Sequence, residues 1–332
     1  MTPPTQDSTL RQAALGGPAP QSRMRRSLRL SPAVEQQARA FERPEAEAES
    51  RVTALDTRYE ELEVSFDAQE RVFWKHMSSQ TRPSYTLAML RDIRRAMNLL
   101  KGMFRDYRDE GDPPVKYVVF ASRMPGVFNL GGDLPLFVEL IRRGDRDGLR
   151  HYAHACIELQ HWRATKLGLP YLSVSLVQGD ALGGGFEATL ADDVIIAERR
   201  AKFGLPEILF NLFPGMGAYS FLSRRLDQVR AEQMIFSGRV YTAEEMHEIG
   251  LVDELAEDGM GEHALYDFIE RNRRCYRSRR AVYEARRKTG SVSYEELAAI
   301  TDSWVEAALN LDKSDVRRME RLAKAQDRRR QR

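Results

Sequence analysis

The sequence has little net charge, few cysteines and no long apolar run, and each absence excludes a class of function. Its 332 residues include 51 basic and 49 acidic side chains, a formal net charge of +2, which argues against a dedicated nucleic-acid binder. Cys156 and Cys275 lie far apart without metal-ligand spacing, so we expect reduced thiols in a cytoplasmic protein and no metal site. No apolar run reaches the ~20 residues that a membrane span needs.

Composition divides the chain into three segments. Residues 1–55 are rich in Pro, Gln, Ser, Ala and Arg, and we expect a disordered or loosely ordered extension there. This extension has no apolar block of signal-peptide length, which argues against secretion. Residues 56–255 alternate strand-like and helix-like patterns and predict an α/β core. Residues 256–332 are mostly helical and end in a basic tail.

Buried strands and amphipathic helices alternate through the predicted core. A hairpin is expected where apolar and polar residues alternate over 62–66 and a second apolar run follows at 72–74. Ser84 is a candidate cap for a helix with apolar residues at helical spacing from Leu87 to about Tyr107. The other expected elements are strands at 116–121, 171–177, 194–197 and 201–204, helices at 134–143 and 147–167, and a non-helical stretch at 251–255.

The stretch 178–193 is the feature around which the rest of the chain is organised. Three glycines at 183–185 lead into a short helical segment that carries Glu187, and N–H groups exposed at such a turn attract negative charge. A dinucleotide fingerprint is rejected because residues 179–182 separate the preceding strand from the glycines. A phosphate-loop motif is also missing from the sequence, which argues against nucleoside triphosphate hydrolysis. We expect no cofactor.

A second glycine turn, at 124–133, also follows a buried strand. If the two strands are neighbours, the N–H groups of Gly132 and Gly184 converge and form an oxyanion hole. Glu187 and Glu207 would flank the same point, and two carboxyls in a partly dry site can act as one acid and one base. The alternative is that each glutamate is a surface or helix-capping acid. The apolar loop around Glu207 argues against that alternative.

Five ordered motifs resemble those of the crotonase (enoyl-CoA hydratase/isomerase) superfamily over roughly residues 60–325. They are Phe128-Asn-Leu-Gly-Gly-Asp133, Gly179-Asp-Ala-Leu-Gly-Gly-Gly-Phe-Glu187, Phe203-Gly-Leu-Pro-Glu207, Pro214-Gly-Met-Gly217 and Phe236-Ser-Gly-Arg-Val-Tyr-Thr-Ala-Glu-Glu-Met-His-Glu-Ile-Gly-Leu-Val-Asp253. Within that superfamily, the loop 203–220 and the turn before Asp133 most resemble the diffusible-signal-factor synthases of Gram-negative bacteria. The segment Met216-Gly-Ala-Tyr-Ser220 departs from the Gly-Gly-Thr-Gln-Arg usual in hydratases, which weighs against a coenzyme A hydratase.

The resemblance implies both a fold and a chemistry. The fold is a repeated ββα spiral core with a helical C-terminal region that forms a homotrimer or higher oligomer and a lid over the pocket. Gly132 and Gly184 match the two oxyanion donors, and Glu187 and Glu207 match the two catalytic acids.

The substrate that the resemblance implies is a 3-hydroxyacyl chain on acyl carrier protein. Dehydration gives a cis-2-enoyl thioester, and hydrolysis releases a free fatty acid that serves as a quorum-sensing signal. A two-component sensor or regulator is an implied partner. Two alternatives remain: an enoyl-CoA hydratase that acts on coenzyme A thioesters, and a non-catalytic regulatory binding protein with the same fold.

An acyl chain requires an apolar pocket, for which Met216, Trp304 and Leu322 are candidates. Trp304 belongs to an apolar stripe on a predicted helix at 295–311; such a stripe forms core or a subunit contact, or here lines the pocket. A basic rim would suit an acidic carrier protein. The candidate rim residues are Arg199, Arg200 and Lys202.

Overall fold

The structure is a computed structural model that describes residues 52–56, 59–108 and 112–330. The chain divides into two units, Met1–Ala48 and Glu49–Arg332. The first unit lies outside the described residues, and so does the predicted extension as far as residue 51. The helices and strands described below all belong to the second unit.

A seven-stranded sheet forms the larger layer of the core, with strand order β1-β2-β3-β4-β6-β8-β11. Its first three strands pair antiparallel, and the strands from β3 to β11 pair parallel. Every described residue of β4, β6 and β8 is buried, as expected for parallel strands covered on both faces. The strands are β1 (Val52–Asp56), β2 (Leu62–Asp67), β3 (Val72–Met77), β4 (Tyr117–Ser122), β6 (Leu172–Val177), β8 (Val194–Glu198) and β11 (Glu254–Ala256).

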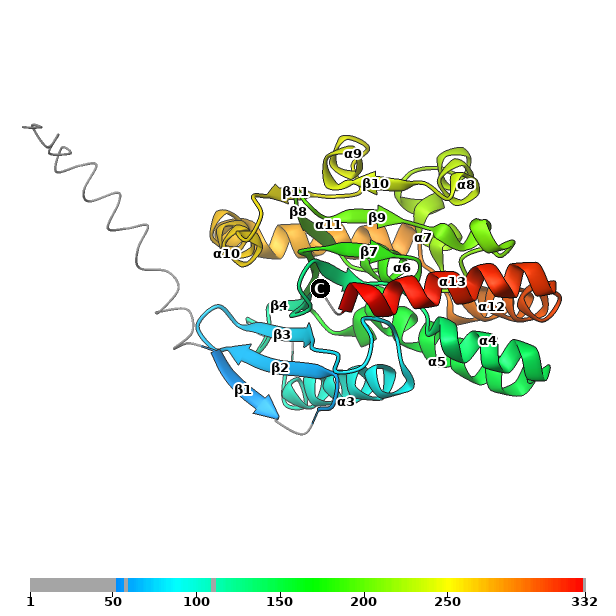
Figure 1. The fold of residues 1–332 in the computed structure, drawn as a ribbon. Helices are drawn as coiled ribbons and strands as arrows, with labels where there is room; N and C mark the ends of the chain where they lie inside the picture. Colours follow the sequence, from blue (N-terminus) through cyan, green and yellow to red (C-terminus); the bar gives the residue numbers. More distant parts are fainter. Residues whose placement is uncertain (1–51, 57–58, 109–111, 331–332) are drawn as a thin grey trace, which may run out of the picture. The chain divides into compact units, whose positions relative to one another are not determined.

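A four-stranded sheet, with order β10-β9-β7-β5, forms the smaller layer. Consecutive strand pairs, β4 with β5, β6 with β7 and β8 with β9, each give one strand to each sheet before the chain turns into a helical segment. The chain therefore winds as a spiral of ββα units (Figure 1), and the predicted fold class is confirmed. The short strands are β5 (Val127–Asn129), β7 (Asp180–Leu182), β9 (Lys202–Gly204) and β10 (Val240–Thr242).

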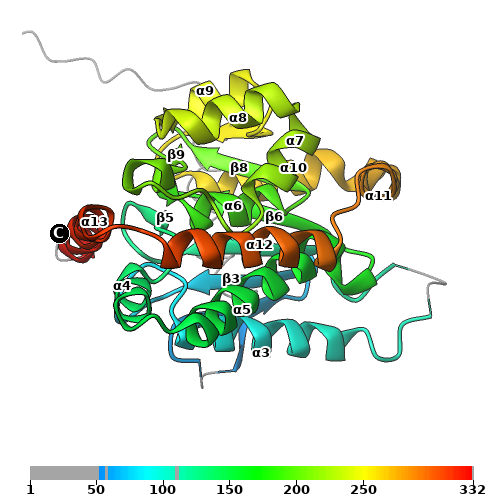
Figure 2. The ribbon, with the colours of Figure 1, turned by 90° about the vertical axis from the view of Figure 1, so that its right-hand side faces the viewer.

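Helices cover both sides of the spiral, and the C-terminal region is helical as predicted. Figure 2 shows α12 running past α5, with α13 beside α4. The helices of the core are α3 (Leu87–Met103), α4 (Leu134–Arg143), α5 (Arg146–Thr165), α6 (Gly184–Leu190), α7 (Ala218–Arg225), α8 (Gln228–Ser237) and α9 (Ala243–Glu248). The C-terminal helices are α10 (Gly261–Asn272), α11 (Tyr276–Thr289), α12 (Tyr294–Leu309) and α13 (Lys313–Arg330), and the 3₁₀ turns are η1 (Lys166–Gly168), η2 (Pro206–Phe210) and η3 (Arg273–Cys275).

The structure corrects three local predictions. Thr86, not Ser84, caps α3: its backbone is extended and its side chain accepts a hydrogen bond from the N–H of Met89. The helix ends at Met103, before the predicted Tyr107. The third correction is β1, which pairs with β2 and begins inside the segment expected to be loosely ordered.

Two hydrophobic clusters lie on opposite faces of the large sheet. Phe73 and Met77 of β3 belong to the cluster between the sheet and α3, α5 and the small sheet. Val72 and Trp74 belong to the other cluster, beneath α10. Because successive side chains of a strand point to opposite faces, one apolar run supplies both clusters.

Two buried ion pairs lie just beyond the C-terminal end of α6. Asp192 accepts hydrogen bonds from Arg163 and from the Ser175 hydroxyl, and its side chain and that of Arg163 are each 5% exposed. Asp193 lies 3.1 Å from the ammonium of Lys166, and both side chains are almost fully buried. These carboxylates are therefore buried together with their counter-charges.

Within the described ranges, no helix is long and apolar enough to cross a membrane. The same residues contain no group of three or more His, Cys, Asp or Glu side chains that could hold a metal ion. Cys156 and Cys275 are both free thiols.

Candidate active site

The two glycine turns predicted from the sequence lie against each other. Gly131, after β5, has a φ of +91°, and a Cβ there would come within 2.8 Å of the Gly184 nitrogen at the start of α6. The Asn129 side chain accepts a hydrogen bond of 2.7 Å from the Gly131 N–H and so fixes the first turn. A side chain at Gly131 would force the turns apart, so glycine is needed both for the backbone angle and for the close approach.

Gly132 and Gly184 both line one cavity. Gly184 is the first residue of α6, so its N–H has no acceptor inside the helix. The N–H of Gly132 makes no hydrogen bond with the described residues. The Tyr152 hydroxyl holds the same turn, because it accepts from the Asp133 N–H and donates to the carbonyl of Tyr85.

Glu187 lies in the first turn of α6 and is 1% exposed. Its Oε1 accepts hydrogen bonds from the N–H groups of Met216, at 2.8 Å, and Ala218, at 2.9 Å. Burial raises the pKa of Glu187 to about 7, and the two N–H donors oppose that rise because they favour the carboxylate. A carboxyl with this pKa is part ionised at neutral pH and can accept a proton.

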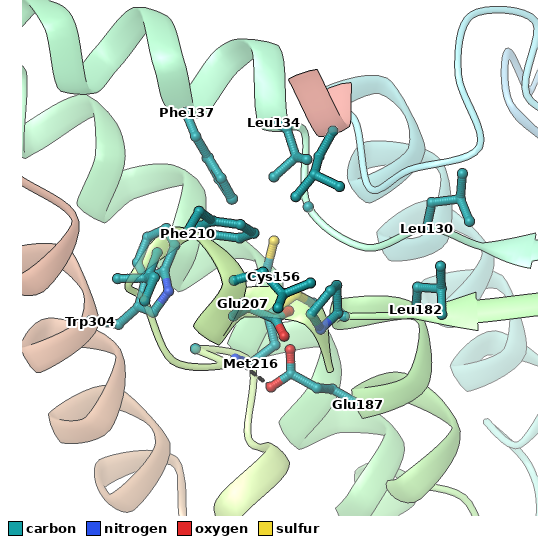
Figure 3. A pocket seen from close by; sticks show the side chains of 18 of the residues that line it. Leu130, Leu134, Phe137, Cys156, Leu182, Glu187, Glu207, Phe210, Met216 and Trp304 are labelled. Carbon is teal, nitrogen blue, oxygen red and sulfur yellow. Dashed lines mark hydrogen bonds between the residues drawn. The ribbon is translucent and has the colours of Figure 1, made fainter. Parts of the chain in front are cut away.

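Glu207 lies in η2 and faces Glu187, as Figure 3 shows. Its Oε1 sits against Gly183, where a Cβ would approach it to 2.6 Å. Its Oε2 is buried and has no hydrogen-bond partner in the described part of the chain. Burial, and then the charge of Glu187, raise the pKa of Glu207 well above its ordinary value. Of the two carboxyls, Glu207 therefore holds its proton more strongly.

The two carboxyls lie in the wall of an apolar cavity of about 260 Å³. Figure 3 shows their oxygens surrounded by aromatic and aliphatic side chains and by Cys156. Phe137 packs edge-on against both Tyr152 and Trp304, with ring centroids 5.1 Å apart in each pair. Such a lining suits an alkyl chain and provides polar groups at one point only, beside the carboxyls.

The loop that presents Met216 to Glu187 is held from the C-terminal region. Thr301 in α12 donates a hydrogen bond of 2.9 Å to the carbonyl of Gly215. The indole of Trp304, one turn further along α12, packs so closely against Gly215 that a Cβ there would meet it at 2.6 Å. The helix α12 therefore sets the position of the N–H groups that orient the carboxylate.

The structure brings together all seven site residues expected from the sequence. The cavity wall includes Gly132, Gly184, Glu187, Glu207, Met216, Trp304 and Leu322. Trp304 serves both uses considered for its stripe, because it is 5% exposed and also lines the cavity. Sequence reasoning missed Phe137, Tyr152 and Cys156, whose helices were predicted but whose facing side could not be assigned from spacing alone.

The predicted basic rim is not part of this cavity. Arg199, Arg200 and Lys202 are absent from its lining. Arg199 forms ion pairs with Glu257 and Glu244, and Arg200 pairs with Glu198. Paired with acids of the same chain, these two arginines offer no excess positive charge to a partner.

Comparison with known proteins gives the same fold and a family. The family described as enoyl-CoA hydratase/isomerase matches residues 99–309. Mitochondrial methylglutaconyl-CoA hydratase of Rattus norvegicus is 28% identical over 211 residues, which cover 61% of this chain and 63% of that protein. Mevalonyl-coenzyme A hydratase of Beauveria bassiana is 41% identical over 86 residues, 26% of this chain and 31% of its own length. The chain thus spans less than two thirds of the length of these relatives.

Solved structures resemble this chain over a larger share of its length. An enoyl-CoA hydratase from Bacillus halodurans has a TM-score of 0.64 at 19% identity and covers 79% of this chain and 99% of its own. The Pseudomonas aeruginosa protein DspI has a TM-score of 0.54 at 22% identity and covers 70% of this chain and 82% of its own. Identities this low establish a shared fold.

Proposed function

The chain belongs to the enoyl-CoA hydratase/isomerase family, and from that premise we propose that it is a dehydratase and thioesterase. Its substrate is a 3-hydroxyacyl thioester of acyl carrier protein, and its product is a free cis-2-unsaturated fatty acid that acts as a diffusible signal. The observation that carries the proposal is the pair of buried carboxyls in unlike environments, Glu187 held by two N–H groups and Glu207 with a bare oxygen.

Dehydration begins at the carbon next to the thioester carbonyl. Glu187, as carboxylate, removes the proton from that carbon, and the electrons move onto the carbonyl oxygen to give an enolate. The N–H groups of Gly132 and Gly184 stabilise the enolate oxygen; removal of one such donor costs ~3–4 kcal/mol. Glu207 donates its proton to the 3-hydroxyl, which leaves as water while the double bond forms.

This step leaves the two carboxyls with exchanged protonation states, and hydrolysis restores them. Glu207, now a carboxylate, removes a proton from water as that water attacks the thioester carbonyl. The same N–H groups stabilise the tetrahedral oxyanion. Glu187, now protonated, donates its proton to the departing thiolate. One dehydration and one hydrolysis thus return both glutamates to their starting state.

A direct test uses purified protein and 3-hydroxydodecanoyl acyl carrier protein, with mass spectrometry of the products. The expected result is time-dependent release of free 2-dodecenoic acid, and none without enzyme. Formation of the enoyl thioester without free acid would support the proposed dehydratase activity and refute the proposed thioesterase activity. No change in the substrate would refute the proposal.

The second candidate function is hydration of enoyl-CoA thioesters, favoured because curated relatives of this chain are coenzyme A hydratases. The same residues would serve, since hydration is the reverse of the dehydration step. Parallel kinetics with the same acyl group on coenzyme A and on carrier protein separate the two. A higher kcat/KM for hydration of the coenzyme A thioester would favour this candidate.

A further inference from the structure

The helix α13 carries a row of basic side chains without acidic partners. Arg317, Arg321 and Lys324 are exposed, and their spacing of four and three residues places them on one side of the helix. None of the three forms an ion pair with a described residue, whereas Arg318 on the neighbouring side lies 3.6 Å from Asp315. The row spans about 10 Å at the helical rise of 1.5 Å per residue.

Several exposed arginines elsewhere on the described surface have acids beside them, whereas the three cations of this row stand together without one. Arg199 pairs with Glu257, Arg271 with Glu254 and Arg273 with Glu270. The whole sequence carries a net charge of only +2. Three cations in a row, none paired with an acid among the described residues, therefore create a local positive potential, of the kind that steers an acidic partner.

The opposite side of the same helix reaches the active-site cavity. Leu322 and Ala325 line that cavity, while Val316 and Met319 are buried against the rest of the protein. Asn211, immediately after η2 and Glu207, donates a hydrogen bond of 3.1 Å to Asp315 of α13. The basic row and the cavity wall thus belong to one firmly packed helix.

We propose that Arg317, Arg321 and Lys324 dock the acidic surface of the carrier protein whose acyl chain enters the cavity. The proposal rests on the function proposed above. The positive charge of the row complements the negative charge of an acidic carrier protein. The length of the row is a second support, because the few phosphates of coenzyme A would contact only one or two of these residues. A protein with a line of acidic side chains can engage all three, and the helix that it contacts also supplies Leu322 and Ala325 to the cavity wall.

The test replaces all three residues with glutamine, R317Q/R321Q/K324Q, and uses R199Q/R271Q/R273Q as the matched control with the same loss of charge. KM and kcat are measured for one 3-hydroxyacyl group on carrier protein and on coenzyme A. The α13 variant is expected to raise KM for the carrier substrate roughly tenfold or more, with kcat unchanged. The control variant, and both variants with the coenzyme A substrate, are expected to match wild type.

Binding of the holo carrier protein, followed by fluorescence anisotropy at two salt concentrations, gives a second readout that does not need turnover. Salt-sensitive binding that is weaker only in the α13 variant would support docking. It would do so even if wild type turned over neither substrate, because a lack of turnover would refute the proposed function and not the docking. An equal rise of KM for both substrates would assign the row to nucleotide phosphates and overturn the proposal. Unchanged carrier binding in the α13 variant would also overturn it.

Discussion

The two ends of helix α6 treat buried carboxyl groups in opposite ways. At the N-terminal end, Glu187 and Glu207 face each other in an apolar cavity, and no basic side chain is among the described residues that line it. Just beyond the C-terminal end, Asp192 and Asp193 are also buried, yet each has a basic partner. The first pair is costly to bury, as is typical of functional sites, whereas the second is buried together with its counter-charges.

The largest difference between the carboxyls at the two ends of α6 is expected when Glu187 and Glu207 are neutralised one at a time. Glu187→Gln keeps an oxygen that accepts from Met216 and Ala218 but cannot take a proton. We expect turnover to fall by roughly 10²–10⁴-fold in either glutamine variant, with a melting temperature no lower than that of wild type. A fall in melting temperature with turnover retained would make the residue structural.

Replacement of an aspartate by asparagine at the C-terminal end of α6 should lower stability and leave turnover unchanged. Asp192→Asn leaves the buried Arg163 without its counter-charge, and breaking a buried pair in this way costs about 3–5 kcal/mol of unfolding free energy. Turnover per folded molecule should stay near wild type. Urea unfolding beside Glu187→Gln provides the matched control, and equal stability of the two variants would contradict the comparison.

The pH dependence should reveal the unpaired carboxyls. The unfolded chain releases the Glu187 proton near 4.5 while the folded chain holds it until about 7, so this residue makes stability fall as pH rises through that window. Glu187→Gln should remove that part of the slope, measured by urea unfolding from pH 4.5 to 7.5.

Activity should follow the opposite trend on the acid side. The value of kcat/KM is expected to rise with an inflection near pH 7, as Glu187 ionises, and to fall again at higher pH as Glu207 loses its proton. A profile that is flat between pH 5 and 9 would exclude the proposed division of roles.

The smallest effect is expected at an exposed pair. Arg199 and Glu257 lie 2.9 Å apart at the surface, where water and salt screen their attraction. Arg199→Ala should leave both turnover and melting temperature within experimental scatter. A clear loss of stability would show that surface pairs matter here as buried ones do.

Much of the site could be predicted because few other roles explain glycines directly after buried strands or glutamates in apolar segments. Three glycines after an apolar strand predict a turn. A second glycine turn, which contains Gly132, follows another apolar strand, and this similarity predicted that the two turns lie together. The alternation of strands and helices predicted an α/β core, whereas the ββα spiral was implied by the family resemblance, because the pairing of strands into two sheets does not follow from their spacing.

Other features depend on contacts between distant segments, which one sequence does not show. Nothing near Glu187 in the chain indicates that the N–H groups of Met216 and Ala218 hold it. Phe137 and Tyr152 read as ordinary helix core until α4 and α5 are placed around the cavity. Arg199 reads as part of a basic surface because its partners, Glu244 and Glu257, lie far along the chain.

The hydrogen bond between Thr301 and Gly215 has a consequence for the order in which activity arises during synthesis. Both glutamates and both glycine turns leave the ribosome well before α12 does. Until Thr301 and Trp304 have emerged and packed on the loop, the N–H groups that orient Glu187 have no fixed position. A nascent chain that already contains both glutamates therefore still lacks the contacts that fix the two N–H donors of Glu187.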